Sequence, residues 1–129
     1  MQGLQHIPVN KIMLIDIDGT ICDDIPNEYS YMFADAEPHP GAARHCNQWY
    51  SKGNQIHFFT AREEKDRHVT EQWLEKHGFK YHSLIMNKPR IKDGQEYVWI
   101  DNRPVRAITY KGVWSHLVSR VTNILTFIH

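Results

Sequence analysis

The sequence predicts an α/β domain of the three-layer, doubly wound (Rossmann-like) kind, with a mainly parallel sheet. Two observations lead to this prediction. Short apolar runs alternate along the chain with segments of helical periodicity, as in βαβ units. The first run, within residues 11–16, has four consecutive apolar residues between polar ones, a pattern typical of a strand buried on both faces.

Length and composition predict the domain organisation. The chain has 129 residues, the usual size of one domain, and it shows no repeat, low-complexity tract or internal linker. We therefore expect residues 1–129 to form a single domain. Strands are expected at residues 11–16, 55–60, 84–86, 97–100 and 107–110.

Helices are expected between and after these strands. Pro40-Gly41 leads into a helical pattern that Gly53 ends, and a second helix begins near Glu63 and ends at Gly78. Residues 114–128 have a strongly amphipathic pattern. We interpret the apolar face of this last helix as packing against the sheet, with a homo-oligomer interface as the alternative.

The composition excludes several classes of protein. Fifteen basic and fifteen acidic residues give a net charge of +0, which argues against a broad nucleic-acid-binding surface, although a local basic patch is compatible with it. The two cysteines form no CxxC pair, and the nine histidines show no zinc-site spacing. Residues 1–10 contain no long apolar run, so we expect neither a signal peptide nor a membrane span, and we expect a cytoplasmic protein.

Polar side chains stand at the ends of four of the expected strands. Because ligands bind beyond the carboxyl ends of the strands in an open parallel sheet, these side chains are expected to meet at one rim. They comprise acids, a hydroxyl and an amine, a set that suits a metal ion and a phosphate. The residues are Asp16 and Asp18 after the first strand, Thr60 in the second, Lys88 after the third and Asp101 after the fourth.

Phosphoryl transfer needs this combination of groups. A carboxylate can attack phosphorus and form an aspartyl phosphate, and a hard cation such as Mg²⁺ relieves the repulsion between the two anions. A second acid protonates the leaving oxygen, while a hydroxyl and an amine hold the charged phosphoryl oxygens. Gly19 permits a tight turn after the acids, where backbone N–H groups are expected to face the phosphate.

At this point the sequence resembles the haloacid dehalogenase (HAD) superfamily. The match runs from about Lys11 to the final helix, and the first motif is the most specific. The other three motifs are short, but their order and their placement after strands are those of the family. The four motifs are Asp16-Ile17-Asp18-Gly19-Thr20, then Thr60 in Phe58-Phe59-Thr60-Ala61-Arg62, Lys88 in Asn87-Lys88-Pro89, and Asp101 in Ile100-Asp101-Asn102-Arg103.

The resemblance implies a role for each matching residue. Asp16 would be the nucleophile and a metal ligand. Asp18 would be the general acid and then the base, with its backbone carbonyl on the metal. Thr60 would bind the transferring phosphoryl group, Lys88 would stabilise its charge, and Asp101 would complete a Mg²⁺ site. In this family an acid at the position of Asp18 marks phosphatases and phosphotransferases rather than dehalogenases.

Four positions near the motif residues leave questions open. The fourth motif often carries two acids, whereas the second position here is Asn102, so metal binding is expected to be weaker or Asn102 to lie outside the ligand set. Lys92 competes with Lys88 for the role of the lysine, and the Asn-Lys-Pro context favours Lys88. Arg62 stands two residues after Thr60, and Arg103 stands two residues after Asp101. We include Arg62 with Thr60 and Gly19 as a phosphate-binding candidate.

The gaps between the motifs are too short for the large cap domains of this superfamily, so the resemblance implies a capless member with an open site. Residues 23–38, with Tyr29, Tyr31 and Phe33, would form a small flap beside it. The flap aromatics have two interpretations of equal weight, namely contact with substrate and packing of the loop onto the sheet.

The sequence therefore predicts a Mg²⁺-dependent phosphatase that hydrolyses a phosphomonoester through an aspartyl phosphate. Its expected partner is a phosphorylated small molecule or an exposed phosphate on a larger molecule. Two alternatives stay open, a receiver-like phosphoacceptor domain and a catalytically silent HAD-like binding domain. The position of Asp18 and Gly19-Thr20 after the first strand favours the enzyme over the receiver.

Overall fold

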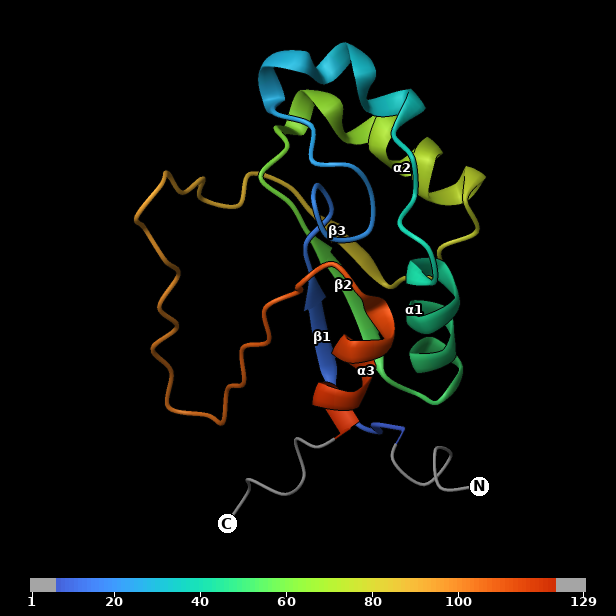
Figure 1. Cartoon of the computed structure of the whole chain (residues 1–129), viewed down its shortest axis with the longest axis vertical. Helices are drawn as coiled ribbons and strands as arrows, with labels where there is room; N and C mark the ends of the chain where they lie inside the picture. The colour runs from blue at the N-terminus through green and yellow to red at the C-terminus, as the bar shows by residue number, and fades with distance from the viewer. Residues whose placement is uncertain (1–6, 123–129) are drawn as a thin grey trace.

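The computed structural model describes residues 7–122 of the chain (Figure 1). The expected C-terminal helix is present up to its last described residue, and residues 123–129 lie outside the described part. The elements in order are β1 (Ile12–Ile15), the 3₁₀ segment η2 (Asn27–Asp35), α1 (Ala42–Ser51), β2 (Gln55–Phe59), the 3₁₀ turn η3 (Glu64–Asp66), α2 (Arg67–Lys76), β3 (Ser83–Ile85) and α3 (Trp114–Thr122).

The strands form a three-stranded parallel sheet in the order β1-β2-β3. β1 pairs with β2 from Ile12 opposite Gln55, and β2 pairs with β3 from His57 opposite Ser83. Parallel pairing makes all three strands end at the same edge, which lies toward η2 in Figure 1. The predicted α/β class with a parallel sheet flanked by helices is confirmed, and so are the first three strands, to within about two residues at their ends.

Much of the core lies between the central strand β2 and helix α2. Phe58 of β2 is fully buried and packs edge-on against Phe79, and Trp73 of α2 stacks on the same Phe79 ring. The indole Nε1 of Trp73 also donates a hydrogen bond to the Ala36 carbonyl oxygen at 2.9 Å, so a buried polar atom is satisfied. This bond and the packing around it join α2 to the segment that follows η2.

The helix ends agree with the predicted stop signals. α1 ends just before Gly53 and α2 just before Gly78, and both glycines have positive φ angles, which only glycine adopts without strain. α3 begins at Trp114, whose ring packs against Trp49 of α1 with 5.9 Å between centroids. Its buried residues Trp114 and Val121 confirm core packing for the described part of this helix. No helix within residues 7–122 is long and apolar enough to cross a membrane.

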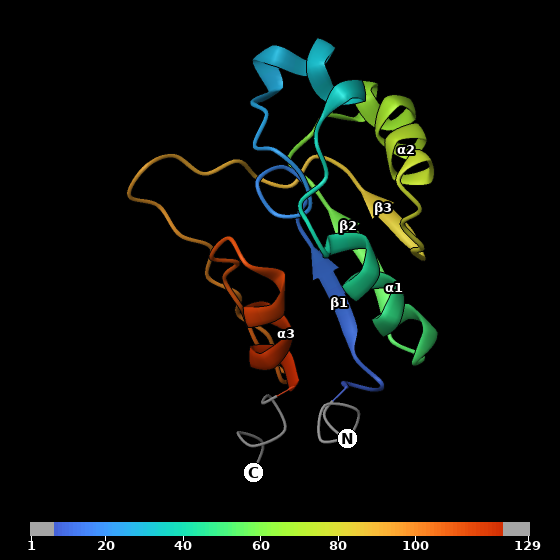
Figure 2. The same ribbon diagram turned by 45° about the vertical axis from the view of Figure 1, so that its right-hand side comes forward.

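The predicted strands at 97–100 and 107–110 are wrong. Residues 89–113 contain neither helix nor strand, and both views show this segment as a wide excursion away from the sheet (Figures 1 and 2). Val98 is 72% exposed and Ile100 is 90% exposed. An apolar run becomes a strand only when a neighbouring strand takes up its backbone hydrogen bonds, and here it has no such neighbour.

The same difference corrects the prediction for β1. This strand was expected to be buried on both faces, but Ile12 is 67% exposed and Leu14 is 40% exposed. In addition, β1 pairs only with β2. β1 is therefore an edge strand in this structure, with one row of backbone groups unpaired.

Candidate active site at the carboxyl ends of the strands

The loop after β1 is held by its own backbone hydrogen bonds. The Thr20 and Ile21 amides donate to the Ile17 carbonyl oxygen, at 3.0 and 2.9 Å, and the Gly19 amide donates to the Cys22 carbonyl oxygen at 2.9 Å. Gly19 has a φ of +82°, and a Cβ there would lie 3.3 Å from the Asp24 side chain. The turn therefore requires glycine. The Gly19 amide, which was expected to face a phosphate, is used inside the loop.

Asp16 directly follows β1 and has two close partners. The Thr20 hydroxyl donates to Oδ2 at 3.2 Å, and the Lys88 ammonium lies 3.9 Å from Oδ1. Burial raises the pKa of the Asp16 carboxyl above its ordinary value, and the positive charge of Lys88 partly offsets this increase. About a third of the Asp16 side chain (36%) remains exposed, so an incoming group can reach it.

Lys88 is placed by the ends of the neighbouring strands. Its backbone amide donates to the Thr60 carbonyl oxygen at 2.9 Å. Its ammonium lies over two aromatic rings, 5.5 Å from the centroid of Phe59 and 4.5 Å from that of Tyr97. Lys92, the competing lysine, is exposed in the segment beyond. The structure thus puts Lys88 beside Asp16.

Thr60 links β2 to β3 at the same rim. Its amide donates to the Ile85 carbonyl oxygen at 2.9 Å, and its hydroxyl oxygen accepts a hydrogen bond from the Arg62 amide at 3.1 Å. The Asn87 amide donates to the Arg62 carbonyl oxygen at 2.8 Å, with Asn87 itself in the left-handed region at a φ of 64°. Thr60 and Lys88 are therefore held in one connected turn.

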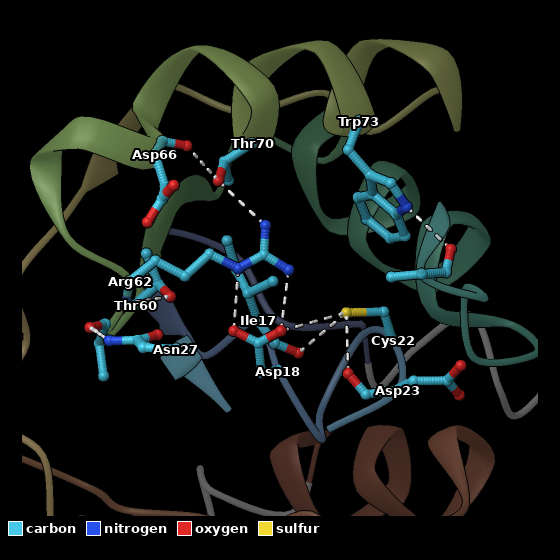
Figure 3. Close-up of polar contacts among 12 residues, drawn as sticks. Ile17, Asp18, Cys22, Asp23, Asn27, Thr60, Arg62, Asp66, Thr70 and Trp73 are labelled. Carbon is cyan, nitrogen blue, oxygen red and sulfur yellow. Dashed lines mark hydrogen bonds and ion pairs between the residues drawn. The ribbon is translucent and has the colours of Figure 1, made fainter. Parts of the chain in front are cut away.

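Asp18 faces a different partner (Figure 3). Arg62 donates two hydrogen bonds to its carboxylate, from Nε to Oδ2 at 2.9 Å and from Nη2 to Oδ1 at 2.8 Å. The third nitrogen, Nη1, donates to the Thr70 hydroxyl at 3.0 Å, and the guanidinium carbon lies 3.7 Å from the centroid of the Phe33 ring. The Arg62 side chain is 0% exposed. Arg62 was predicted to contact a phosphate, whereas the structure commits its guanidinium to Asp18, Thr70 and Phe33.

Sequence reasoning missed the partners of Arg62. Thr70 stands within the second helical pattern without any local motif. Phe33 was considered only as one of three flap aromatics. No signal in the sequence pairs Asp18 with a residue 44 positions away.

The flap aromatics were interpreted either as packing onto the sheet or as contacting substrate, and the structure places them differently from one another. Phe33 is fully buried, as packing requires, whereas Tyr29 and Tyr31 are exposed, and their rings meet edge-on at 6.2 Å. The Asn27 side-chain amide donates to the Ala61 carbonyl oxygen at 3.0 Å, which ties the flap to the turn after β2. The flap is thus anchored at the site, with two tyrosines available to solvent.

Asp101 is not brought to the other acids. It lies in the extended segment, where its carboxylate accepts hydrogen bonds from the Trp99 indole and from the Arg103 amide, both at 3.1 Å. These two bonds lower the pKa of the Asp101 carboxyl. Asn102 and Arg103 are exposed beside it. Within residues 7–122 no cluster of three or more acids, histidines or cysteines could hold a metal ion. The oxygen donors of Asp16 and Asp18 suit Mg²⁺, so the expected ligand set is present only in part.

A groove of about 760 Å³ opens beside the unpaired edge of β1. Asp16, Thr20 and Lys88 lie along it, together with Trp114 and Leu117 of α3 and parts of the extended segment. The candidate site is therefore open on the side of β1 that faces away from β2.

Comparison with known families decides the assignment. The family model described as "PITM 1-3, LNS2 domain" matches residues 13–100, which is more than half of the chain. The chain belongs to this LNS2 family. The resemblance to the HAD superfamily is thereby confirmed at the level of an HAD-like LNS2 domain. The matched range includes Asp16, Asp18, Thr60 and Lys88 and ends one residue before Asp101.

Two solved structures share the fold of this LNS2 domain. A chain in the structure of the Pnkp1/Rnl/Hen1 complex is 22% identical with a TM-score of 0.55, over 68% of this chain and 31% of that chain. The crystal structure of a target protein from Vibrio cholerae is 18% identical with a TM-score of 0.54, over 88% of this chain and 97% of that one. The chain thus spans less than a third of the first protein's length. None of the curated proteins matches the sequence.

Proposed function

We propose that this LNS2 domain is a Mg²⁺-dependent phosphatase that hydrolyses a phosphomonoester through an aspartyl phosphate on Asp16. One observation carries the proposal. Two carboxylates stand two residues apart, and each has its own cationic partner, Lys88 for Asp16 and Arg62 for Asp18. Different surroundings are what allow two neighbouring acids to perform different tasks in one reaction.

In the first half of the reaction, an Asp16 oxygen attacks phosphorus and the bond to the leaving oxygen breaks. Asp18, protonated beforehand from solvent on the side that Arg62 does not occupy, gives this proton to that oxygen and becomes a carboxylate. In the second half, Asp18 takes a proton from water while the water oxygen attacks the phosphoryl group. Asp16 is then released together with inorganic phosphate.

Two further residues support the charge on the phosphoryl group. The Lys88 ammonium, 3.9 Å from Asp16, is placed to neutralise phosphoryl oxygens as they approach the nucleophile. The Thr60 hydroxyl lies in the same turn, buried at 1% exposure, and its hydrogen is the donor that we propose for those oxygens. Mg²⁺, held by Asp16, Asp101 and the backbone carbonyl of Asp18, would supply the remaining charge neutralisation.

Asp101 joins this ligand set only when residues 97–100 approach the rim. The free edge of β1 is adjacent to the groove, and the apolar side chains of residues 97–100 are exposed. Pairing of that segment with β1 would satisfy unpaired backbone groups and bury apolar surface. Both effects favour the approach.

The proposal is tested by Mg²⁺-dependent phosphate release from a panel of phosphate esters. We expect Asp16→Asn to abolish release, because an amide cannot form the aspartyl phosphate. Asp35→Asn, an exposed acid on η2, is the matched control and should keep the activity. Full activity in Asp16→Asn would sink the mechanism.

The separation of Asp101 from the rim favours a second candidate, a catalytically silent HAD-like domain that binds a phosphorylated partner. It predicts binding of inorganic phosphate without turnover of any ester. Stable phosphorylation of Asp16 without turnover would instead favour the receiver-like alternative.

A further inference from the structure

We propose that Arg62 is a positioning residue that holds Asp18 ready for proton transfer and does not bind the substrate phosphate. This inference rests on the proposed phosphatase function. Among the described residues, Arg62 is the arginine that contacts Asp18, and we infer that it binds this acid rather than the phosphoryl group. Its other contacts link Asp18 to the flap and to α2.

The Arg62 guanidinium makes a two-point contact with the Asp18 carboxylate. Its Nε and Nη2 atoms reach the two oxygens of Asp18 at 2.9 and 2.8 Å, as a planar guanidinium does with a carboxylate (Figure 3). This fork fixes the plane of the Asp18 carboxylate as well as its position. An ammonium group has no such plane, so lysine cannot reproduce the arrangement.

The remaining surface of the guanidinium is also occupied. Nη1 donates to the Thr70 hydroxyl at 3.0 Å, and Thr70 in turn donates to the Asp66 carbonyl oxygen at 2.7 Å. The Phe33 ring covers the guanidinium face at 3.7 Å. Every nitrogen of Arg62 has a protein partner, and the side chain is fully buried. A phosphoryl group could bind Arg62 only by displacing these partners.

Asp18 keeps one side open. Its side chain is 15% exposed, so part of the carboxyl group remains accessible while Arg62 occupies the other part. Cys22, which lies 3.9 Å from Oδ1, is an uncharged neighbour because burial raises the pKa of its thiol to about 12. The accessible part of Asp18 is where a proton can be exchanged with a leaving group.

Arg62 acts on the proton-transfer step through Asp18. When the bond between phosphorus and the leaving oxygen breaks, the electron pair stays on that oxygen, which takes the proton of Asp18. Asp18 is left as a carboxylate, and the two Arg62 hydrogen bonds keep it in the same position and plane to take the next proton from water. The benefit of Arg62 is therefore greatest when the leaving oxygen needs that proton most.

The test compares two esters that carry the same phosphoryl group, an alkyl phosphate and p-nitrophenyl phosphate. An alkoxide leaving group needs a proton, whereas nitrophenolate leaves well without one. We expect Arg62→Lys to lower kcat/KM about 100-fold for the alkyl ester and less than about 10-fold for the nitrophenyl ester, in line with the usual size of general acid catalysis. Competitive inhibition by inorganic phosphate should change less than about 2-fold.

The matched control is Arg67→Lys on the same part of the chain. Arg67 pairs with Glu64 and Glu71 at the surface rather than with Asp18, so both esters should be turned over as in the wild type. Thr70→Val supplies a second variant, because it removes one support of the guanidinium and leaves both bonds to Asp18. It should show the same preference for the nitrophenyl ester at smaller amplitude, even where Arg62→Lys folds poorly.

Several outcomes would overturn the inference. An equal loss of kcat/KM for both esters in the Arg62 and Thr70 variants would mean that Arg62 does not act through the acid. Weaker inhibition of Arg62→Lys by inorganic phosphate would show that Arg62 binds the phosphate. If the wild-type protein turned over neither ester, the proposed phosphatase function would be wrong. If the wild type were active and the Arg62 variant lost the same activity toward both esters, only the role of Arg62 would be wrong.

Discussion

Two regions of this LNS2 domain differ in how far their strand-like apolar runs are buried. In residues 12–88 the sheet and helices enclose Phe58 and Trp73, whereas in residues 89–113 Val98 and Ile100 are 72% and 90% exposed. Both regions contain runs that are typical of strands. The difference lies in pairing, because the runs of the first region have neighbours that accept their backbone hydrogen bonds.

The candidate site divides along the same boundary. Asp16, Asp18, Thr60 and Arg62 belong to the packed region, and the structure holds them with short contacts. Asp101 belongs to the extended segment and stays apart. Lys88 lies at the junction, with its ammonium over Phe59 on one side and Tyr97 on the other. The comparison therefore predicts different responses to substitution in the two regions.

The largest effect is expected in the packed core. Trp73→Ala removes the stack on Phe79 and leaves the Ala36 carbonyl without its indole donor. We expect the free energy of unfolding to fall by about 3–5 kcal/mol, measured by urea denaturation. A loss below about 1 kcal/mol would show that this region is packed more loosely than the structure indicates.

At the junction we expect an effect on catalysis. Lys88→Ala removes the positive charge beside Asp16, and the rate of phosphate release should fall about 100-fold or more, as when one donor to a developing anion is lost. Lys92→Ala, in the exposed segment, is the control and should keep its rate. If both variants lost the same fraction of the rate of phosphate release, the place of Lys88 beside Asp16 would not be the cause of the loss.

A smaller effect is expected in the loop after β1. Gly19→Ala places a Cβ 3.3 Å from the Asp24 side chain at a φ of +82°, so we expect a loss of about 1–2 kcal/mol in unfolding free energy. Gly53→Ala has a similar φ of +92° with no atom within 4 Å, and it separates backbone strain from crowding. Crowding at Gly19 predicts the larger loss there, and thermal unfolding of both variants measures the difference.

The smallest effect is expected in the extended segment, and it tests the comparison most directly. Without Mg²⁺, Ile100→Ala should change the unfolding free energy by less than about 0.5 kcal/mol, because the side chain is almost fully exposed while residues 97–100 stay away from β1. A buried isoleucine such as Ile56 should lose about 2–5 kcal/mol on the same change. If Ile100→Ala matched Ile56→Ala in urea denaturation without Mg²⁺, residues 97–100 would already pack against the protein, whereas the proposed approach of Asp101 predicts a larger effect of Ile100→Ala only when Mg²⁺ is added.

Much of the packed region could be predicted from the sequence. Apolar runs located β1, β2 and β3, and the glycines at 53 and 78 marked the ends of two helices, because these signals are local. The placement of Asp16 and Lys88 at one rim also followed, since parallel strands end at a common edge. The same reasoning failed at 97–100, where local composition says nothing about whether a pairing partner is present.

The sequence by itself determined the α/β class, the family-like order of the motifs and the glycine needed after the two aspartates, all of which depend on neighbouring residues. Only the tertiary structure decided which cation serves which acid. Arg62 and Asp18 are 44 positions apart, and Phe33 and Thr70 complete the contact from two other segments. Such a pairing depends on burial and on distances across the fold, which no local pattern contains.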